Sequence, residues 1–306
     1  MAIKGKSIIS IDDISKEDII QILETAKKIE KIKDKTRLLH GKIMASLFFE
    51  PSTRTRNSFE AAANGLGMKI IGFSDPNTSS VTKGETIHDT IKMIENYADI
   101  IVMRHFLEGA PRAAELATKK SVINCGDGAN QHPTQTLLDL YTIKKTQGKI
   151  SGINIAMVGD LKYGRTVHSL ASALCHFGAR FYFVAPKELQ MPKEYLDRIE
   201  KAGLTYSLHE KMEEVINNVD ILYCTRIQKE RFPDPLEYER LKNVYILRAP
   251  MLKNARDNMK ILHPLPRVNE IEIDVDQTKH AHYFEQAANG VPIRQTLLLM
   301  CMGKKV

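Results

Sequence analysis

Short apolar runs alternate with amphipathic segments along the whole chain. In the first half, the apolar runs have the length of buried strands and end at breakers or polar residues. Between the runs, apolar residues recur at helical spacing, beginning after a capping box at Ser15–Asp18. The pattern predicts strands at 43–49, 68–73, 99–103 and 121–124, and helices over 19–29, 57–63, 85–97, from 111, and over 133–147.

The same alternation resumes after a break at 148–152. It predicts strands at 153–158, 180–185, 220–224 and 259–262, and helices at 193–201 and 283–302. Strands that alternate with helices form parallel sheets with right-handed crossovers. We therefore expect an α/β protein with two doubly wound parallel-sheet domains joined by two connecting helices. The expected domains are 1–132 plus 290–306 and 150–283, and the expected connecting helices are 133–149 and 284–302, the second starting or kinking at Pro292.

One stretch, at 48–56, joins a predicted strand to a predicted helix through Ser52, Thr53, Arg54, Thr55 and Arg56. A helix start offers free N–H groups and the positive end of the helix dipole, and Arg adds a fork of donors suited to phosphate oxygens. The alternative is an ordinary N-cap. Three hydroxyls alternating with two arginines exceed what a cap needs, so this turn is predicted to bind a phosphate group.

Further polar residues follow other predicted strands of the first half. Arg104 ends one strand, and a Gly-rich turn after another delivers His132 and Gln135 to a helix start. Ligands of open α/β sheets bind at the carboxyl ends of strands. A lone His is more often structural. The alternative for Ser80 and Lys83, in the long polar loop 74–85, is that they are solvated residues without a role in binding. The repetition of such clusters favours a binding site.

The second half carries comparable signals. The turn 159–166 resembles the first turn of a dinucleotide fold but lacks the G-x-G-x-x-G spacing, so a nicotinamide cofactor is not supported. Arg165 gives this turn a positive charge instead, and Arg226 and Gln228 follow the strand at 220–224. In the turn 263–267, two prolines fix an extended conformation, which is either a structural bend or a preset pair of carbonyl acceptors.

Composition narrows the class of protein. The 306 residues are 43% hydrophobic and 26% charged, with a net charge of +7, which suits either nucleic acid or an anionic small substrate. The lysines are scattered, Trp is absent and the aromatic content is 7%, so a basic RNA-binding protein is disfavoured. Four widely spaced cysteines predict free thiols rather than a zinc site, and no apolar run reaches membrane length. We expect a cytoplasmic protein without metal, cofactor, nucleic-acid or membrane partner.

Taken in order, these motifs resemble those of the aspartate and ornithine carbamoyltransferase family. The resemblance extends over nearly the whole chain. The Thr-Arg-x-Gln-Lys-Glu-Arg segment at 225–231 resembles the aspartate-binding type, whereas the ornithine enzymes carry a Ser-Met-Gly loop and a Cys in the His-x-Leu-Pro turn, where this chain has Pro264. The motifs are Phe-Glu-Pro-Ser-Thr-Arg-Thr-Arg at 49–56, the loop 80–83, Arg104, His-Pro-Thr-Gln at 132–135, Arg165, 225–231, and His-Pro-Leu-Pro-Arg at 263–267.

The resemblance implies transfer of the carbamoyl group of carbamoyl phosphate to the α-amine of L-aspartate, the committed step of pyrimidine biosynthesis. The amine would attack directly, through a tetrahedral intermediate and without a covalent enzyme intermediate. An ornithine-type acceptor is the alternative, which Arg165 and Arg226 disfavour because like charges repel. By resemblance the catalytic residues are Arg54, Thr55, Arg104, His132 and Lys83.

The resemblance also assigns the binding residues. Ser52, Thr53, Arg54 and Thr55 would hold the phosphate, and Thr55, Arg104 and His132 would point at the carbonyl oxygen. Gln135 and the backbone carbonyls near Leu265 and Pro266 would take the carbamoyl amine. Aspartate would be bound by Lys83, Arg165, Arg226 and Gln228.

Assembly is also implied by the resemblance. Ser80 and Lys83 resemble residues that reach in from the neighbouring subunit of a homotrimer, and some family members assemble with a regulatory chain. Glu50, an anion beside an anion site, is unfavourable unless it is paired. We expect it to bridge to Arg165 and Arg231 and to help hold the domains closed, the alternative being a merely solvated carboxylate.

Overall fold

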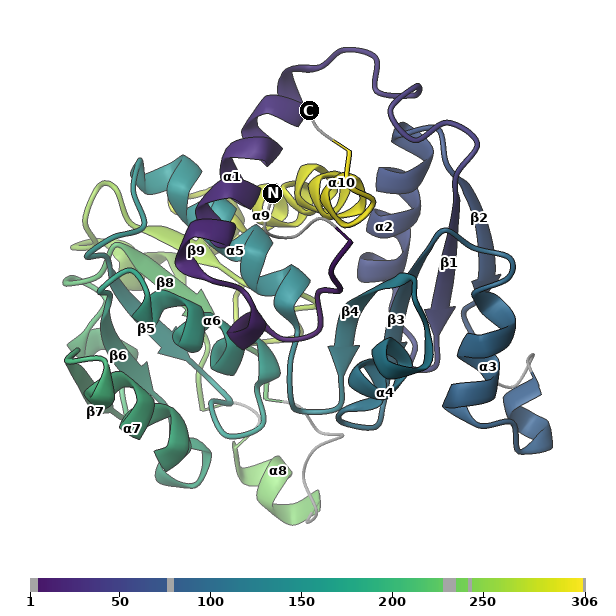
Figure 1. Ribbon diagram of the computed structural model, residues 1–306. Coiled ribbons are helices and arrows are strands. Elements are labelled where there is room, and N and C mark those ends of the chain that lie inside the picture. Colours follow the sequence, from purple (N-terminus) through teal and green to yellow (C-terminus); the bar gives the residue numbers. More distant parts are fainter. Residues whose placement is uncertain (1–4, 76–79, 228–234, 242–243, 305–306) are drawn as a thin grey trace. The chain divides into compact units, whose positions relative to one another are not determined.

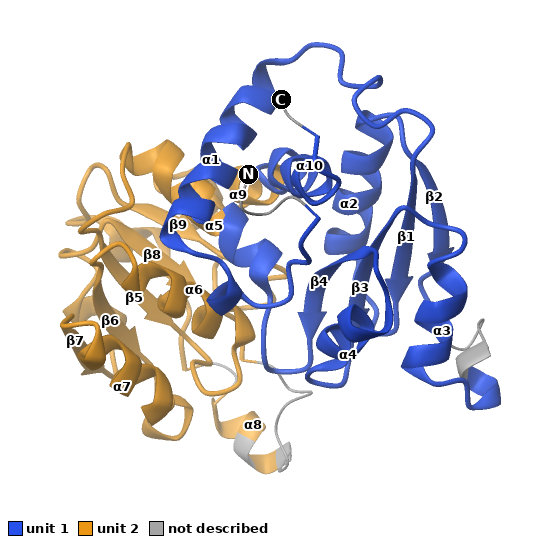
Figure 2. Ribbon diagram, in the orientation of Figure 1, with its two compact units in different colours: residues 1–138, 289–306 blue, residues 139–288 orange. Residues whose placement is uncertain are grey.

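A computed structural model describes residues 5–75, 80–227, 235–241 and 244–304 (Figure 1). The chain forms two compact units, Met1–Leu138 with Asn289–Val306 (unit 1) and Asp139–Ala288 (unit 2) (Figure 2). Each unit contains one parallel sheet, four-stranded in unit 1 and five-stranded in unit 2. Two parallel-sheet α/β units are what the alternation of apolar runs predicts.

The sheet of unit 1 has the strand order β2-β1-β3-β4. Its strands are β1 (Ile43–Phe48), β2 (Lys69–Phe73), β3 (Ile100–His105) and β4 (Ser121–Asp127). Its helices and 3-10 turns are η1 (Ile11–Asp13), α1 (Lys16–Lys31), α2 (Thr53–Gly65), η3 (Ser80–Lys83), α3 (Ile87–Ile94), α4 (Ala110–Ala117) and α10 (Gly290–Cys301). The strand order reverses direction along the chain between β1 and β3, so a ligand site is expected at their carboxyl ends.

Side chains of this sheet alternate between two covered faces, as the pleat requires. Ala45 and Leu47 of β1 belong to one apolar cluster with Ile91 of α3 and Ala114 of α4. On the other side, α10 packs against both α1 and α2. Because helices cover both faces, the strands read as nearly continuous apolar runs rather than as an alternating pattern.

The sheet of unit 2 has the order β7-β6-β5-β8-β9, which reverses between β5 and β8. Its strands are β5 (Asn154–Val158), β6 (Arg180–Val184), β7 (Tyr206–His209), β8 (Ile221–Cys224) and β9 (Lys260–Leu262). Its helices and 3-10 turns are α6 (Arg165–Cys175), η4 (Lys187–Leu189), α7 (Lys193–Lys201), η5 (Met212–Glu214), α8 (Pro235–Leu241), η7 (Ala249–Leu252), η8 (Ile273–Gln277) and α9 (Tyr283–Ala288). Helix α5 (Pro133–Gln147) begins in unit 1 and continues into unit 2.

The structure differs from the predicted elements in several places; helices α6 and α8, for example, were not predicted. Strand β7 was not predicted, because it is a short edge strand whose residues are half-buried or exposed and lack an apolar run. The C-terminal segment, predicted as one helix over 283–302, is two helices, α9 and α10, separated at Asn289. Pro292 lies in the first turn of α10, two residues after Gly290, which agrees with the prediction that a helix starts or kinks at this proline.

The four cysteines are free. Burial raises the pKa of Cys125 to about 12 and that of Cys301 to about 12, so both remain protonated thiols near neutral pH. Among the described residues, no helix combines the length and the apolar character needed to cross a membrane.

Candidate active site

The turn between β1 and α2 has the geometry of an anion site. Phe48 and Phe49 are buried, and Ser52 then takes an extended conformation at the helix N-cap, with φ −157° and ψ 102°. Its hydroxyl does not cap the helix. The first turn of α2 therefore presents N–H groups that no N-cap side chain satisfies, at the positive end of the helix dipole.

The two arginines of this turn differ in their surroundings. Arg56 forms an ion pair with Glu60 one turn along α2, Nε to Oε1 2.7 Å. Arg54 and Thr53 lie exposed at the helix start, and Thr55 is buried beside them. The phosphate-binding role predicted for Ser52, Thr53, Arg54 and Thr55 thus falls on residues at the first turn, whereas Arg56 is held by its own helix.

Parallel pairing of β1 with β3 brings Arg104 to this turn. Phe48 is the register partner of Arg104, and the Phe49 N–H donates to the Arg104 carbonyl over 2.9 Å. The Arg104 side chain, 13% exposed, donates from Nε to Glu50 Oε2 over 2.9 Å and from Nη1 to Ser52 Oγ over 3.2 Å. The guanidinium group is therefore fixed in direction by two residues of the turn.

This ion pair shows a partner of Glu50 that the sequence did not suggest. The expected partners were Arg165 and Arg231, and the bridge to them stays a prediction; Arg231 lies outside the described residues. In unit 1, Glu50 carries a charge-assisted hydrogen bond from Arg104, a residue 54 positions away. A carboxylate beside an anion site is thereby neutralised within its own unit.

The loop from β4 to α5 supplies His132 and Gln135, both nearly buried. The His132 carbonyl accepts the N–H groups of Gln135 and Thr136, which begin the helix. The ring atom Nδ1 of His132 lies 3.5 Å from the Thr134 hydroxyl oxygen. Pro133 is the first helical residue, so His132 and Gln135 occupy one helical turn, as predicted from their spacing.

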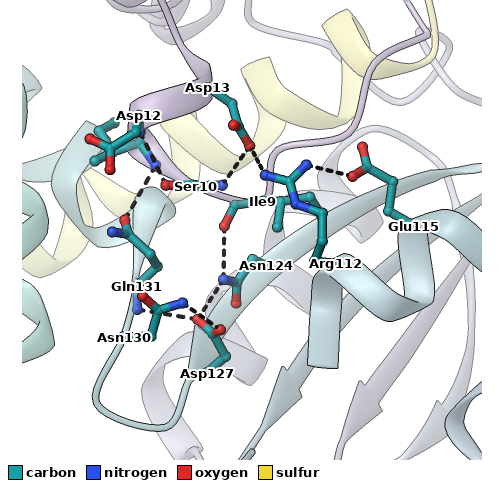
Figure 3. Close-up of polar contacts among 11 residues, drawn as sticks. Ile9, Ser10, Asp12, Asp13, Arg112, Glu115, Asn124, Asp127, Asn130 and Gln131 are labelled. Carbon is teal, nitrogen blue, oxygen red and sulfur yellow. Dashed lines mark hydrogen bonds and ion pairs between the residues drawn. The ribbon is translucent and has the colours of Figure 1, made fainter. Parts of the chain in front are cut away.

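Asp127, 1% exposed, holds this loop together (Figure 3). Its Oδ1 accepts from Asn124 Nδ2 over 2.8 Å and from the Gln131 N–H over 3.2 Å. Its Oδ2 accepts from the Gly109 N–H over 2.9 Å and from Asn130 Nδ2 over 3.0 Å. A buried carboxylate with these four donors fixes the chain immediately before His132.

The N-terminal segment is tied to the same loop (Figure 3). Asn124 Nδ2 also donates to the Ile9 carbonyl over 2.9 Å, and the Gln131 side chain accepts the Ile11 N–H over 3.3 Å. Asp13 continues the network to Arg112 of α4. These residues were not predicted from the sequence, because their partners are roughly a hundred positions away and no local pattern marks them.

In unit 2, the turn after β5 requires glycine at 159. Gly159 has φ +117°, and a Cβ atom there would lie 2.2 Å from the Thr225 carbonyl oxygen. This close approach joins the ends of β5 and β8, where the Thr225 N–H donates to the Val158 carbonyl over 2.8 Å. Arg165 at the start of α6 and Arg226 after β8 therefore come from neighbouring strand ends, where the strand order of the sheet reverses.

The remaining predicted residues lie on loops. Leu265 and Pro266 follow β9 in a turn where Leu265 has φ +57°. Ser80 and Lys83 bound the 3-10 turn η3, and Lys83 is exposed. Gln228 lies outside the described residues. Within the described part of the chain, no group of three or more His, Cys, Asp or Glu side chains is placed to hold a metal ion.

Two family models match consecutive parts of the chain. Residues 6–145 match "Aspartate/ornithine carbamoyltransferase, carbamoyl-P binding domain", and residues 151–301 match the "Asp/Orn binding domain" of the same proteins. This chain belongs to the aspartate/ornithine carbamoyltransferase family.

Curated relatives support the assignment. The aspartate carbamoyltransferase catalytic subunit of Parabacteroides distasonis is 58% identical over 98% of this chain and 98% of its own length. That of Chromobacterium violaceum is 54% identical over 98% of this chain and 99% of its own.

Solved structures of family members are similar in fold. The catalytic subunit of M. jannaschii aspartate transcarbamoylase is 50% identical, with a TM-score of 0.90 over 96% of this chain and 97% of that chain. Trypanosoma cruzi aspartate transcarbamoylase in complex with N-(phosphonacetyl)-L-aspartic acid is 39% identical, with a TM-score of 0.92 over 98% of this chain and 96% of that chain.

The family models divide the predicted site residues into two sets. Those at the ends of β1, β3 and β4 fall in the carbamoyl-P binding model, and Arg165, Arg226, Leu265 and Pro266 fall in the Asp/Orn binding model. In this carbamoyltransferase, the members of each set that follow β1, β3, β5 and β8 lie where the strand order of the sheet reverses, whereas those that follow β4 and β9 come from the outer strands.

Proposed function

We propose that the chain transfers the carbamoyl group of carbamoyl phosphate to the α-amine of L-aspartate, giving N-carbamoyl-L-aspartate and phosphate. The observation that carries this proposal is the pair Arg165 and Arg226, which come from neighbouring strand ends of the unit matched by the Asp/Orn binding model. Two guanidinium groups suit an acceptor with two carboxylates and repel the cationic side chain of ornithine. Relatives named aspartate carbamoyltransferase catalytic subunit, 54–58% identical, support the same acceptor.

Carbamoyl phosphate is assigned to unit 1. The first turn of α2, with Ser52, Thr53, Arg54 and Thr55, holds the phosphate, and Arg54 offsets the charge that grows on it as it leaves. Thr55, Arg104 and His132 donate to the carbonyl oxygen and stabilise the oxyanion of the tetrahedral intermediate. Each preorganised donor of this kind lowers the activation free energy by about 3–4 kcal/mol.

Glu50 contributes by holding the Arg104 guanidinium in place before the reaction begins. Its carboxylate holds the Nε side of Arg104, and Ser52 contacts Nη1, so the guanidinium needs little rearrangement when an oxyanion forms. Gln135 and the carbonyl groups near Leu265 and Pro266 accept from the carbamoyl amine. The acceptor amine attacks directly, and no nucleophilic side chain is required.

The aspartate set is Lys83, Arg165, Arg226 and Gln228. Lys83 and Ser80 are contributed by a neighbouring subunit of a homotrimer, and the name "catalytic subunit" of the relatives is what supports a regulatory chain as a further partner. The reaction is the committed step of pyrimidine biosynthesis in the cytoplasm.

The acceptor is tested by incubating the purified chain with carbamoyl phosphate labelled with ¹³C at the carbonyl carbon and an equimolar mixture of L-aspartate and L-ornithine. Product identity is read by ¹³C NMR. The proposal predicts carbamoyl-aspartate as the dominant product. Carbamoyl-ornithine as the dominant product would overturn the assignment of Arg165 and Arg226 to a dicarboxylate.

A further inference from the structure

The turn after β9 contains a buried histidine whose two ring nitrogens have different partners. His263 is 1% exposed. Its Nδ1 accepts the Leu265 N–H over 2.7 Å, and its Nε2 lies 2.7 Å from Glu270 Oε1. Its backbone N–H donates to Gln286 of α9 over 2.7 Å. The ring is therefore fixed in position and orientation.

These contacts decide which nitrogen carries the proton. A backbone N–H only donates, so Nδ1 must be unprotonated, and in a neutral ring the proton lies on Nε2 and is donated to Glu270. The other oxygen of Glu270 accepts the N–H groups of Val268 and Asn269 over 3.0 and 3.1 Å. With donors on both oxygens, Glu270 is a carboxylate acceptor that keeps the His263 proton on Nε2.

The charges around the ring are consistent with this state. Burial lowers the pKa of His263 and outweighs the opposing effect of Glu270, while Arg267 and Arg226 also disfavour the charged ring. Protonation at Nδ1 would place two N–H groups against each other. The neutral ring with its proton on Nε2 is thus the form that the turn accommodates.

The bond to Nδ1 sets the direction of backbone carbonyls in the turn. A trans peptide places its carbonyl opposite its N–H, so fixing the Leu265 N–H also fixes the Pro264 carbonyl, which points away from His263. Leu265 has φ +57°, a conformation that a Leu residue adopts only when its surroundings hold it there. Further along, Arg267 is paired with Asp276, Nη2 to Oδ2 2.6 Å, which fixes the far end of the turn.

We propose that His263 is a positioning residue for carbamoyl transfer, because its unprotonated Nδ1 fixes the peptide that orients the carbonyl acceptors of this turn. Glu270 acts through His263 by holding the proton on Nε2. The inference rests on the proposed function, in which carbonyl groups of this turn accept from the carbamoyl amine of carbamoyl phosphate.

Two substitutions at the same position separate this role from simple packing. In H263N, the shorter amide oxygen can still accept the N–H two residues on, as in an Asx-turn, but the contact to Glu270 is lost. In H263Q, the longer amide can still donate to Glu270, but the acceptor for Leu265 is lost. E270Q tests the position of the ring proton. In this variant the amide oxygen accepts the N–H groups of Val268 and Asn269, so the NH₂ group faces Nε2 of His263. Nε2 must then accept, which moves the ring proton to Nδ1.

The steady-state kcat/KM for carbamoyl phosphate is measured at saturating L-aspartate, together with urea unfolding of each variant. We expect about a tenfold loss of kcat/KM in H263Q and E270Q and less than about a threefold loss in H263N, with H263N and H263Q equally destabilised. H280N is the matched control, because His280 is also buried in unit 2 and its Nδ1 lies 2.9 Å from the Met259 carbonyl oxygen. It should lower stability without lowering kcat/KM.

A second readout needs no activity. Nitrogen NMR of the ¹⁵N-histidine-labelled protein, with His263 assigned from the variants, should show an unprotonated Nδ1 and a protonated Nε2 in the wild-type chain. A protonated Nδ1 would overturn the inference. So would equal kcat/KM losses in H263N and H263Q. Absence of carbamoyl transfer by the wild-type chain, with the ring as described, would instead overturn the proposed function on which the positioning role rests.

Discussion

Replacing Asp127 with Asn tests how the loop before His132 is held. The substitution keeps the size of the side chain and removes one oxygen and the negative charge. Asp127 is 1% exposed and accepts four hydrogen bonds, two on each oxygen. However the amide is turned, two of the four donors then face its NH₂ group.

The expected loss follows from these contacts. A hydrogen bond to a charged group contributes about 1.5–3 kcal/mol to the free energy of unfolding. The variant loses two such bonds but no longer buries a charge, so the net loss should be about 3 kcal/mol. Unfolding free energies change by about 2–3 kcal/mol per molar urea for a unit of this kind, so the unfolding midpoint of unit 1 should fall by about 1 M. Since the loop ends at His132, kcat/KM should fall about tenfold under conditions where the variant stays folded.

Urea unfolding is followed by far-ultraviolet circular dichroism, because the chain has no Trp. The control is Asp13→Asn, the same chemical change in the same network at an exposed ion pair with Arg112. Such pairs contribute at most about 1 kcal/mol, so the control should unfold close to the wild type. If Asp127→Asn unfolds within about 0.2 M of the Asp13→Asn control, the reasoning on buried carboxylate contacts is refuted.

Three further predictions concern other positions. Gly159→Ala should destabilise unit 2 by roughly 3 kcal/mol or more in urea unfolding, whereas Gly178→Ala, also at positive φ but with open space around the new Cβ, should cost only about 1 kcal/mol; equal losses would contradict the close-approach argument. Burial lowers the pKa of His168 to about 4, so the unfolded chain binds this proton below about pH 6.5 while the folded chain does not. The contribution of neutral His168 to the free energy of unfolding is therefore complete above about pH 6.5 and is about 2 kcal/mol smaller at pH 5. The non-titrating variant His168→Gln should lack this decline when its unfolding is measured at both pH values. Glu50→Gln should lower kcat about tenfold by loosening Arg104, and an unchanged kcat and aspartate KM would argue against any role for this carboxylate.

Much of the fold follows from the pattern of apolar runs. Buried parallel strands such as β1 and β5 consist almost entirely of apolar residues, so their positions are evident without a partner. Strand β7 lacks this signal because it lies at a sheet edge and owes its pairing to β6. The break between α9 and α10 lies at Asn289, three residues before Pro292, where the sequence predicts a helix start or kink.

Candidate site residues could be named from the sequence where they follow strands. The structure places Ser52, Arg104, Arg165 and Arg226 after strands where the order of the sheet reverses, and His132 after the outer strand β4.

The groups that hold these side chains were not predicted. Asp127 depends on Gly109 and Asn124, and Glu50 depends on Arg104, contacts that only the folded chain creates. The ring orientation of His263 likewise depends on Glu270, seven residues away across a turn.

The phosphate site is tested most directly by comparing Arg54→Ala with Arg56→Ala in phosphate release from carbamoyl phosphate in the presence of L-aspartate. The two arginines are two residues apart on α2, and Arg56 is held by Glu60. We predict aspartate-dependent release by the wild-type chain, loss of at least about a thousandfold in Arg54→Ala, and less than about a threefold loss in Arg56→Ala. Equal activity of the two variants, or no aspartate-dependent release by the wild-type chain, would contradict the assignment of this helix start to the phosphate of carbamoyl phosphate.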